Sequence, residues 1–390
     1  MNTLKAELAR FQSVKDLKPI LTAQGPCLSL YVGLSSAPPP QGAKANELEW
    51  KEIVRRIEPK LKQYGTQGRE LLESIMDWDA ILPAGKARGN SLAVFRSPDQ
   101  FRVAWLDEPT SSRAVVGPHF YIRPLLPQVT RNAVFDILAL SRNDVRMLRC
   151  TSRNSEEVAF PPGVKTSFDD WMNTAKPDHV SNTMEVGGPS TGSMKGVMST
   201  YSTTDREDRG EFVAHFFGQI DRGVNELLRG RSEPVVLAGV DHQLSLYRSI
   251  STYPNLAQEA VQGAPNGLKA GEMHARALEA MSRCYRKKVD DVLAEYNHKA
   301  GGGASNRLKD IVTAAHDGRV LTLLVSDSLE STGVFDQATH TVKARETGGS
   351  EDEDLINDAA VQTILHAGQV YVVQNGRMPN GAPLAAIFRF

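Results

Sequence analysis

The chain has 390 residues, of which 45 are Lys or Arg and 46 are Asp or Glu, so its formal net charge is −1. This balance excludes a protein that coats nucleic acid through an overall positive charge, and leaves a local basic patch as the alternative. At about 100–200 residues per domain, the length predicts two or three domains. No apolar run reaches the roughly 18–20 residues of a membrane span, so no membrane association is expected.

The three cysteines, Cys27, Cys150 and Cys284, lie far apart and form no Cys-x-x-Cys pair. This spacing argues against a disulfide framework and against a cysteine-rich zinc site. The first residues lack the apolar segment of a signal peptide. A reducing cytoplasm is therefore the expected location.

A first domain, residues 1–127, is predicted to mix helices and strands. A helix is expected at about 3–16, and the Pro-rich segment Gly117–Pro127 is interpreted as an interdomain connector. Between them, apolar spacing and turn residues predict two further helices and three strands: strand Cys27–Gly33, helix Glu47–Tyr64, a helix through Leu71–Met76, and strands Ser91–Phe95 and Phe101–Trp105.

A second domain, residues 128–268, has the pattern of an α/β unit. The apolar strands Val134–Leu140 and Val145–Cys150 flank a turn and predict a hairpin. A stripe at helical spacing over Phe212–Leu228 predicts an amphipathic helix. The all-apolar Pro234–Val240 predicts a strand buried on both faces, and Asp241 opens the next helix.

Between the hairpin and the long helix lies a polar segment with little periodicity. Ser, Thr and Gly supply 15 of the 30 residues at 181–210. Loops longer than about 12–15 residues are uncommon in compact domains. This segment is therefore predicted to be functional, disordered or both.

A third domain, residues 269–390, is predicted to be a second compact α/β unit. No element is predicted at 330–350, and Ser350 is expected to cap a helix whose first turn is the acidic stretch 351–354. The other expected elements are helices and strands with clear apolar patterns: helices Leu278–Tyr296 and Asn306–His316, strands Val320–Val325, Val370–Val373 and Leu384–Phe390.

The usual catalytic signatures are missing: the chain has no HExxH or Walker motif, no GxSxG at a nucleophile elbow and no GxGxxG between a strand and a helix. No catalytic residue, resident metal or cofactor is therefore predicted. One acidic alternative is open, in which Asp136, Asp221 and Asp241 meet and hold Mg²⁺. In the other interpretation, Asp241 only caps the helix that it precedes.

Two groups of basic residues are candidates for contact with nucleic-acid phosphates. Arg142 and Arg146 lie on or beside the predicted hairpin, and Arg286 and Lys287 lie in a cationic run on the long helix, next to Tyr285. Such a run with a neighbouring aromatic ring suits a nucleic-acid backbone and a stacked base. The alternative is an ordinary solvated helix face.

A mosaic of short motifs, taken together, carries a resemblance to a known family: Ser29–Val32, His119–Pro127, Leu138–Ser141, Val236–Asp241, Leu308–Gly318 and the ending Ile387–Phe390. The chain resembles the bacterial archaeo-eukaryotic release factor-like proteins, relatives of the class-one release factors of archaea and eukaryotes and of Pelota. The resemblance implies three α/β domains, with an RNase H-like central domain and a C-terminal domain like the kink-turn-binding ribosomal protein fold.

In that superfamily, a Gly-Gly-Gln tripeptide on the central-domain loop positions water against the peptidyl-tRNA ester. The equivalent loop here, 181–206, has Gly187 and Gly188 followed by Pro189, so hydrolysis is not carried over. The two glycines are candidates for RNA contact or for a flexible turn. Three basic residues in or near the loop are further candidates for RNA contact: Lys195, Arg206 and Arg209.

The resemblance implies a non-catalytic protein that binds ribosome or tRNA sites and senses or rescues stalled ribosomes. In the C-terminal domain, the stretch Arg307–Asp310 lacks the glycine of true kink-turn binders, so a protein partner there is as well supported as RNA. Two alternatives are open: a metal-dependent hydrolase or nuclease acting on tRNA or peptidyl-tRNA through the three carboxylates, and a scaffold without RNA binding. The oligomeric state is not predicted.

Overall fold

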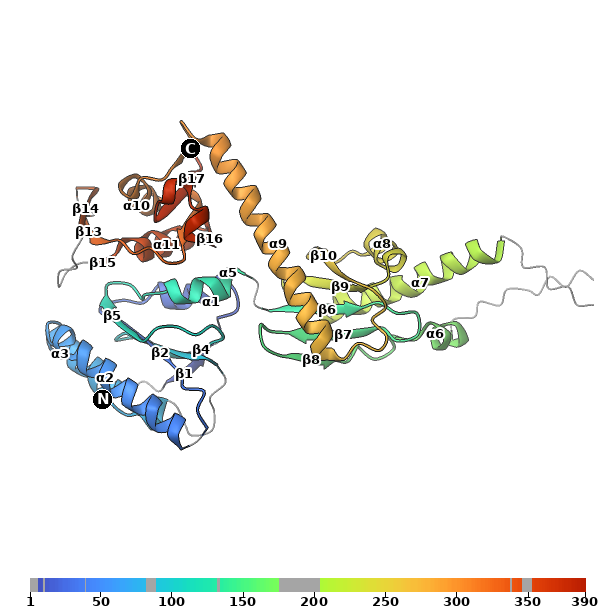
Figure 1. The fold of residues 1–390 in the computed structure, drawn as a ribbon, viewed down its shortest axis with the longest axis horizontal. Helices are drawn as coiled ribbons and strands as arrows, with labels where there is room; N and C mark the ends of the chain where they lie inside the picture. Colours follow the sequence, from blue (N-terminus) through green and yellow to red (C-terminus); the bar gives the residue numbers. More distant parts are fainter. Residues whose placement is uncertain are drawn as a thin grey trace, which may run out of the picture. The chain divides into compact units, whose positions relative to one another are not determined.

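The computed structural model describes residues 6–9, 11–38, 40–81, 89–131, 134–174, 204–336, 339–345 and 353–390, except for the side chains of residues 80, 204–209 and 344–345. Helices and sheets are mixed throughout, which confirms the predicted α/β class (Figure 1). The chain forms two compact units. Unit 1 contains Met1–Ala133 and Tyr285–Phe390, and unit 2 contains Val134–Cys284.

The N-terminal part of unit 1 is a five-stranded sheet in the order β1-β4-β3-β2-β5. Its strands are β1 (Glu7–Ala9), β2 (Cys27–Gly33), β3 (Ser91–Arg96), β4 (Phe101–Leu106) and β5 (Arg113–Gly117). The helices α2 (Gln41–Lys62), α3 (Gly65–Ile75) and α4 (Trp78–Ile81) follow β2.

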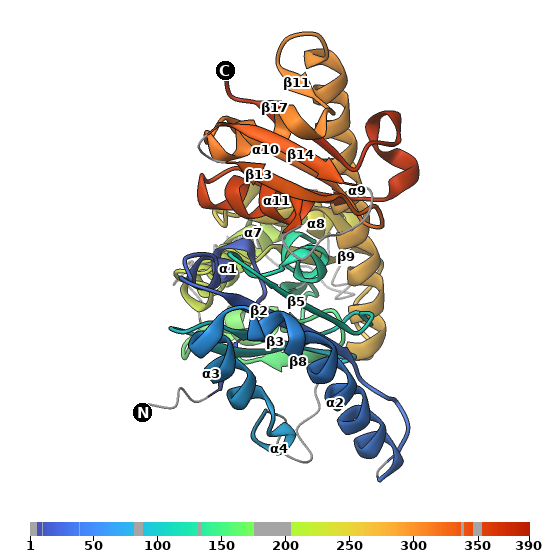
Figure 2. The same cartoon turned by 90° about the vertical axis from the view of Figure 1, so that its left-hand side faces the viewer.

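Alternation along β2 explains how this sheet is covered on both faces. Leu28, Leu30 and Val32 pack with α2 and α3, whereas Cys27 and Tyr31 pack into a core on the opposite face. Figure 2 shows α2 and α3 on one side of β2 and β3, with α1 (Val14–Leu21) on the other. A strand with two buried faces thus holds the N-terminal part together.

The predicted helix at 3–16 is wrong. Residues Glu7–Ala9 form β1, which pairs in parallel with Arg102–Ala104 of β4. Helix α1 begins only at Val14, where the backbone N–H of Ser13 donates to Asp16 Oδ2 at 2.8 Å. Pairing with a sheet edge therefore overrides the local helical pattern, as tertiary contacts often do.

The segment interpreted as a connector is buried rather than exposed. It leads into the short helices η1 (Arg123–Leu125) and α5 (Leu126–Thr130), each with a proline in its first turn. Phe120, Ile122 and Leu125 are at most 1% exposed. They pack in one core with the five-stranded sheet and with the helices at residues 308–316 and 355–365, so this segment joins both parts of unit 1.

The C-terminal part of unit 1 contains a four-stranded sheet in the order β11-β17-β12-β16. Leu323 and Val325 of β12 pack with α10 and α11, and Leu324 packs with the second half of α9 on the other face. The elements are β11 (Ala304–Ser305), β12 (Val320–Ser326), β16 (Gln369–Val373), β17 (Leu384–Phe388), η2 (Asn375–Arg377), η3 (Pro379–Gly381), α9 (Ala270–Lys299), α10 (Leu308–His316) and α11 (Leu355–Leu365).

Two expectations around residues 330–354 are corrected. The stretch without predicted elements holds the hairpin β13 (Thr332–Asp336) and β14 (Thr341–Arg345), and β15 (Glu353–Asp354) pairs with β13. Helix α11 begins at Leu355, and the Asp354 carboxylate caps it by accepting from the next two backbone N–H groups in the first turn. Ser350 lies outside the described residues.

Unit 2 is a five-stranded sheet in the order β10-β9-β6-β7-β8. Strands β6, β7 and β8 are antiparallel neighbours, and β6, β9 and β10 are parallel. This order is that of the RNase H-like fold expected for the central domain. The strands are β6 (Phe135–Ala139), β7 (Arg146–Cys150), β8 (Ser155–Val158), β9 (Val235–Gly239) and β10 (Leu256–Gln262).

Helices cover both faces of the unit 2 sheet. Val235 and Leu237 of β9 pack with α7 (Thr204–Leu227) and α8 (Asp241–Ile250). Val236 and Ala238 pack with the first half of α9 on the other face. The short helix α6 (Phe168–Thr174) adds Phe168 to the first of these cores. Burial on both faces explains the all-apolar sequence of β9.

The predicted domains 1–127, 128–268 and 269–390 remain a prediction beside these two units. The first and third contribute together to unit 1, and unit 2 corresponds most closely to the second. Among the described residues, no helix has the length and apolar character needed to cross a membrane.

Candidate functional site

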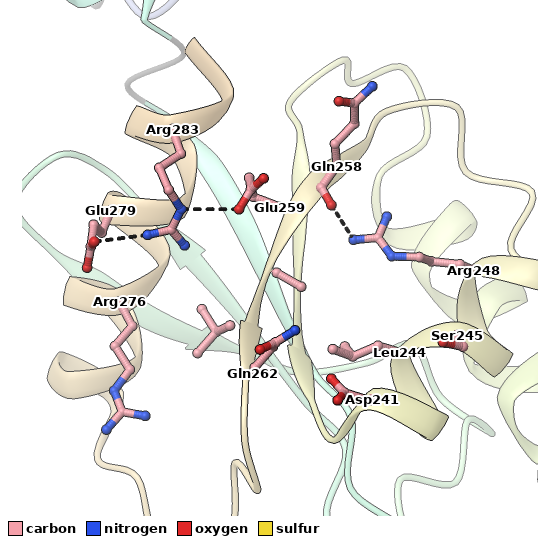
Figure 3. A pocket seen from close by; sticks show the side chains of 12 residues that line it. Asp241, Leu244, Ser245, Arg248, Gln258, Glu259, Gln262, Arg276, Glu279 and Arg283 are labelled. Atoms are coloured by element: carbon pink, nitrogen blue, oxygen red, sulfur yellow. Dashed lines mark hydrogen bonds and ion pairs between the residues drawn. The ribbon is translucent and has the colours of Figure 1, made fainter. Parts of the chain in front are cut away.

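A cavity of about 780 Å³ lies in unit 2, beside the end strand β10. Helix α8 and the first half of α9 form its two walls (Figure 3). The lining is mostly polar and charged: Asp241, Leu244, Ser245, Arg248, Gln258, Glu259, Ala260, Val261, Gln262, Arg276, Glu279 and Arg283.

The cavity follows the edge of β10 rather than one face of the sheet. Five successive residues of the strand, 258–262, line it. Successive side chains of a strand point to opposite faces, so a cavity on one face would meet only every second residue. Contact with all five places the cavity alongside the strand, where an edge exposes unpaired N–H and C=O groups.

The first half of this edge is irregular and is held by α8. Leu256 pairs with Val235, and regular pairing with β9 resumes at Ala260. The guanidinium of Arg248 donates to the carbonyl oxygens of Ala257 and Gln258, both at 2.9 Å. This side chain therefore satisfies backbone acceptors that the irregular pairing leaves available.

The α9 wall carries arginines that are already engaged. Arg283 Nε lies 3.1 Å from Glu259 Oε2, and its Nη1 lies 2.9 Å from Glu279 Oε1. Arg276 donates to Glu272 at 2.8 Å. Partly exposed pairs of this kind contribute little to stability, but they orient the side chains along the wall. The lining holds three guanidinium groups and three carboxylates, so its formal charge is balanced.

Asp241 lies at the carboxyl end of β9 and is the first residue of α8. The N-cap position belongs to Val240, so the expected capping role of Asp241 is corrected. Its exposed carboxylate has no partner among the described groups.

Asp136 lies at the opposite end of the strands from Asp241, on the central strand β6. It is the second residue of β6, where it pairs with Val235, and it is 1% exposed. Burial raises the pKa of its carboxyl, and Arg149, whose Nε donates to Oδ1 at 3.2 Å, partly offsets this. Val235 begins β9 and Asp241 follows its end, so the five-residue strand, roughly 16 Å long, lies between the positions of the two residues.

Asp221 lies in α7 and serves packing within unit 2. It is 4% exposed. Its carboxylate accepts hydrogen bonds from Tyr247 Oη at 3.1 Å, Ser251 Oγ at 2.6 Å and Thr252 Oγ1 at 2.7 Å. These bonds tie α7 to the end of α8.

The expected meeting of Asp136, Asp221 and Asp241 is therefore not seen. Across the described ranges, no group of three or more His, Cys, Asp or Glu residues is placed to hold a metal ion. The physical reason is that long-range packing buries Asp136 and Asp221 at separate places, Asp136 beside Arg149 and Asp221 beside Tyr247. Asp241 follows the far end of β9, the strand that begins beside Asp136.

The basic candidates fall into two groups. In unit 2, the guanidinium of Arg142 lies 4.6 Å from the ring centre of Phe168, and Arg146 donates to the carbonyl oxygen of Pro265 at 3.2 Å. In unit 1, Arg286 and Lys287 are exposed on α9. Arg142 and Arg146 thus have structural contacts within unit 2.

Only two of the five candidates for RNA contact in or near the loop lie among the described residues. Gly187, Gly188 and Lys195 lie outside the described residues. Arg206 and Arg209 belong to the first turns of α7, which begins at Thr204, and their side chains are not described.

Sequence reasoning missed the cavity at β10. The strand itself was not predicted, because Leu256–Gln262 mixes polar and apolar residues and pairs irregularly. A signal was present on α9, where Glu272 with Arg276 and Glu279 with Arg283 are spaced as i,i+4 pairs. Such pairs mark one face of a helix, but do not reveal which strand edge it borders.

Comparison with known families gives one match. Residues 134–319 match the model described as bacterial archaeo-eukaryotic release factor family 3. This match starts at the first residue of unit 2 and extends through α9 and α10. None of the curated proteins compared with the chain matches it.

Several solved structures are similar over much of their length. An archaeal translation termination factor, aRF1, is 18% identical, with 97% of this chain and 98% of that chain covered and a TM-score of 0.24. Archaeal Pelota, in a model of ribosome-bound Pelota and ABCE1, is 13% identical, with 99% and 95% covered and a TM-score of 0.40. Dom34 of S. cerevisiae is 11% identical, with 77% and 79% covered and a TM-score of 0.35. Similarities at this level assign no function to the chain.

Proposed function

Because the chain belongs to a release-factor-like family, matched over residues 134–319, we propose that it is a translation-factor-like protein that binds ribosome or tRNA sites without catalysing hydrolysis. Its proposed role is the sensing or rescue of stalled ribosomes. The family match is the observation that carries this proposal, since it covers all of unit 2 and continues into unit 1.

The non-catalytic character rests on residue chemistry. The Gly187-Gly188 pair is followed by Pro189, where the superfamily's hydrolytic tripeptide has Gln. A prolyl residue has neither the side-chain amide nor a backbone N–H with which to position water. The alternative of a metal-dependent hydrolase gains no support, because the three carboxylates stay apart within the described part of the chain.

The basic side chains Arg286 and Lys287 on α9, and Lys195 in the polar segment, are the proposed contacts with RNA phosphates. Contacts of this kind release condensed counterions, so affinity falls steeply as salt rises. The near-neutral net charge restricts such binding to a local surface.

The test is co-sedimentation of the purified chain with bacterial 70S ribosomes, empty and stalled, across a salt series. We expect selective pelleting with stalled ribosomes, and a weaker salt dependence after Arg286→Glu or Lys195→Glu. Arg55→Glu is the matched control, because Arg55 is 81% exposed on α2 and is not a proposed contact. Absence of pelleting with ribosomes, subunits or tRNA at low salt overturns the proposal.

A further inference from the structure

We propose that the edge of β10 is a docking site for one extended peptide segment of a partner protein. The segment adds to the unit 2 sheet as a further strand and places a basic side chain against Asp241. This inference is independent of ribosome binding, because it rests on the geometry of the cavity beside β10.

The first argument is the position of the cavity. Strand β10 ends the sheet, and its residues 258–262 all border the open space. Strand addition uses this kind of edge: backbone hydrogen bonds supply affinity, and pockets for alternate side chains supply specificity.

The second argument is the direction of the backbone amides. The N–H of Gly263 donates to the carbonyl oxygen of Gly239 at 3.0 Å, toward β9. Neighbouring residues of a strand direct their backbone groups to opposite sides, so the N–H groups of Gln262 and Ala260 point away from β9. These are the donors that an added strand would meet.

The third argument is that only half of the edge is protected. Irregular pairing and inward charges are common ways to blunt a sheet edge. Here Arg248 covers the carbonyl oxygens of residues 257 and 258 only. From Ala260 to Gln262 the strand pairs with β9 in unbroken register, so this stretch keeps the regular form that a further strand requires.

The two helices that wall the cavity determine which side chains the added segment needs. Helices α8 and α9 pack on opposite faces of the sheet, so alternate side chains of an added strand meet one wall and then the other. Asp241 and Gln262 both line the cavity, and Figure 3 shows both in the lower part of the view. The exposed carboxylate of Asp241 has no partner among the described groups, so a Lys or Arg side chain on the α8 side complements it.

The same lining disfavours a nucleic acid in this cavity. Each of its three arginines already binds a carboxylate or backbone oxygens, and three carboxylates balance them. A phosphate backbone needs excess positive charge, whereas a peptide backbone needs hydrogen-bond partners along an edge.

The experiment is selection of displayed random heptapeptides on the full chain, with Ala260→Pro as the counter-selection. Proline at this position removes an outward N–H and leaves the bonds to β9 in place, which edge strands tolerate. We expect enriched peptides that share a Lys or Arg at one position and bind Ala260→Pro at least tenfold more weakly.

Two further measurements keep the result interpretable if Ala260→Pro fails to fold. Synthetic copies of the enriched peptides, N-methylated at alternate residues, should lose binding to the unchanged chain in one methylation phase only. Asp241→Asn should weaken binding at least fivefold and relax the preference for a basic residue. The control is Asp79→Asn, an exposed carboxylate in the first turn of α4 in unit 1.

Three results overturn the inference. One is a selection that enriches no peptide for the unchanged chain over Ala260→Pro, when the variant is folded. Another is binding that is indifferent to N-methylation in both phases. The last is a dimer of the chain in sedimentation velocity that Ala260→Pro abolishes, which would make a second copy the occupant of the edge.

Discussion

The side-chain amide of Asn357 holds the backbone at Ile122, 235 residues earlier in the sequence. Its Oδ1 accepts from the N–H of Ile122 at 2.7 Å, and its Nδ2 donates to the carbonyl oxygen of Phe120 at 3.1 Å. Both bonds are buried. One residue of α11 thus satisfies two backbone groups of the segment that leads into α5.

Asn357→Leu should lower the free energy of unfolding by about 2–4 kcal/mol, because a buried donor and a buried acceptor lose their partners at about 1–3 kcal/mol each before relaxation. Urea denaturation followed by tryptophan fluorescence measures this. Gln362→Leu on the same helix is the control, with an expected change within about 0.5 kcal/mol. Equal effects of the two substitutions would contradict the role given to Asn357.

Arg123 forms a second buried link in unit 1. Its Nη1 lies 2.7 Å from Asp354 Oδ2, and its Nη2 donates to the carbonyl oxygen of Leu329 at 2.6 Å. Arg123→Ala should cost about 3–5 kcal/mol, since it leaves the largely buried carboxylate of Asp354 without its cationic partner. Lys51→Ala, which removes an exposed pair with Glu47, should cost less than about 1 kcal/mol. The same denaturation measurement compares them, and similar losses would refute the distinction.

Asp221→Asn and Asp241→Asn should have different effects: the first lowers the stability of the fold, and the second weakens peptide binding. Asp221→Asn weakens a buried acceptor of several hydrogen bonds, so we expect a loss of about 1.5–3 kcal/mol in unfolding free energy. Asp241→Asn alters an exposed carboxylate and should change stability by less than about 0.5 kcal/mol. Thermal unfolding of both variants checks this. If Mg²⁺ raised the unfolding temperature of the unchanged chain and Asp221→Asn abolished that rise, Asp221 would instead belong to a metal site.

Glu353 makes the stability of unit 1 pH-dependent. Burial, and after it the charge of Asp358, raise the pKa of its carboxyl from 4.5 to about 7, and His316 acts in the opposite direction. Because the folded pKa lies above the unfolded value, this group stabilises the fold below about pH 4.5 relative to high pH. Its contribution is lost as pH rises to about 7.

Glu353→Gln should therefore raise the unfolding temperature at pH 8.5 and leave it unchanged at pH 4. Discounted for partial exposure, the gain is about 1 kcal/mol, or roughly 2–4 °C in a unit of this size. Differential scanning calorimetry at the two pH values measures it. The exposed Glu108→Gln is the control, and a gain at both pH values would show that ionisation is not the cause.

The sequence predicted unit 2 best where apolar residues follow one clear period. The hairpin β6–β7, the helix α7 and the strand β9 all bury regular apolar stripes. The hairpin β13–β14 was missed because Gly333 and Val342 are the only buried residues among those of its strands whose side chains are described. Its pairing depends on neighbours that the local pattern does not contain.

The candidate site was less accessible to sequence reasoning. Arg248, Glu259 and Arg283 come from three elements, and nothing local indicates that they border the same strand edge. The acidic alternative shows the converse error. Asp136, Asp221 and Asp241 have suitable chemistry, but their positions are set by long-range packing that separates them.

Unit 1 is discontinuous in the chain, and this affects how the protein is made. Residues 1–133 leave the ribosome first, but much of the core around Phe120 and Ile122 comes from α11. Synthesis at about 5–20 residues per second leaves those early residues without that cover for roughly 10–50 s. Unit 2 is continuous and becomes complete within this interval. During synthesis, one apolar face of the N-terminal sheet therefore stays exposed until α11 has been translated.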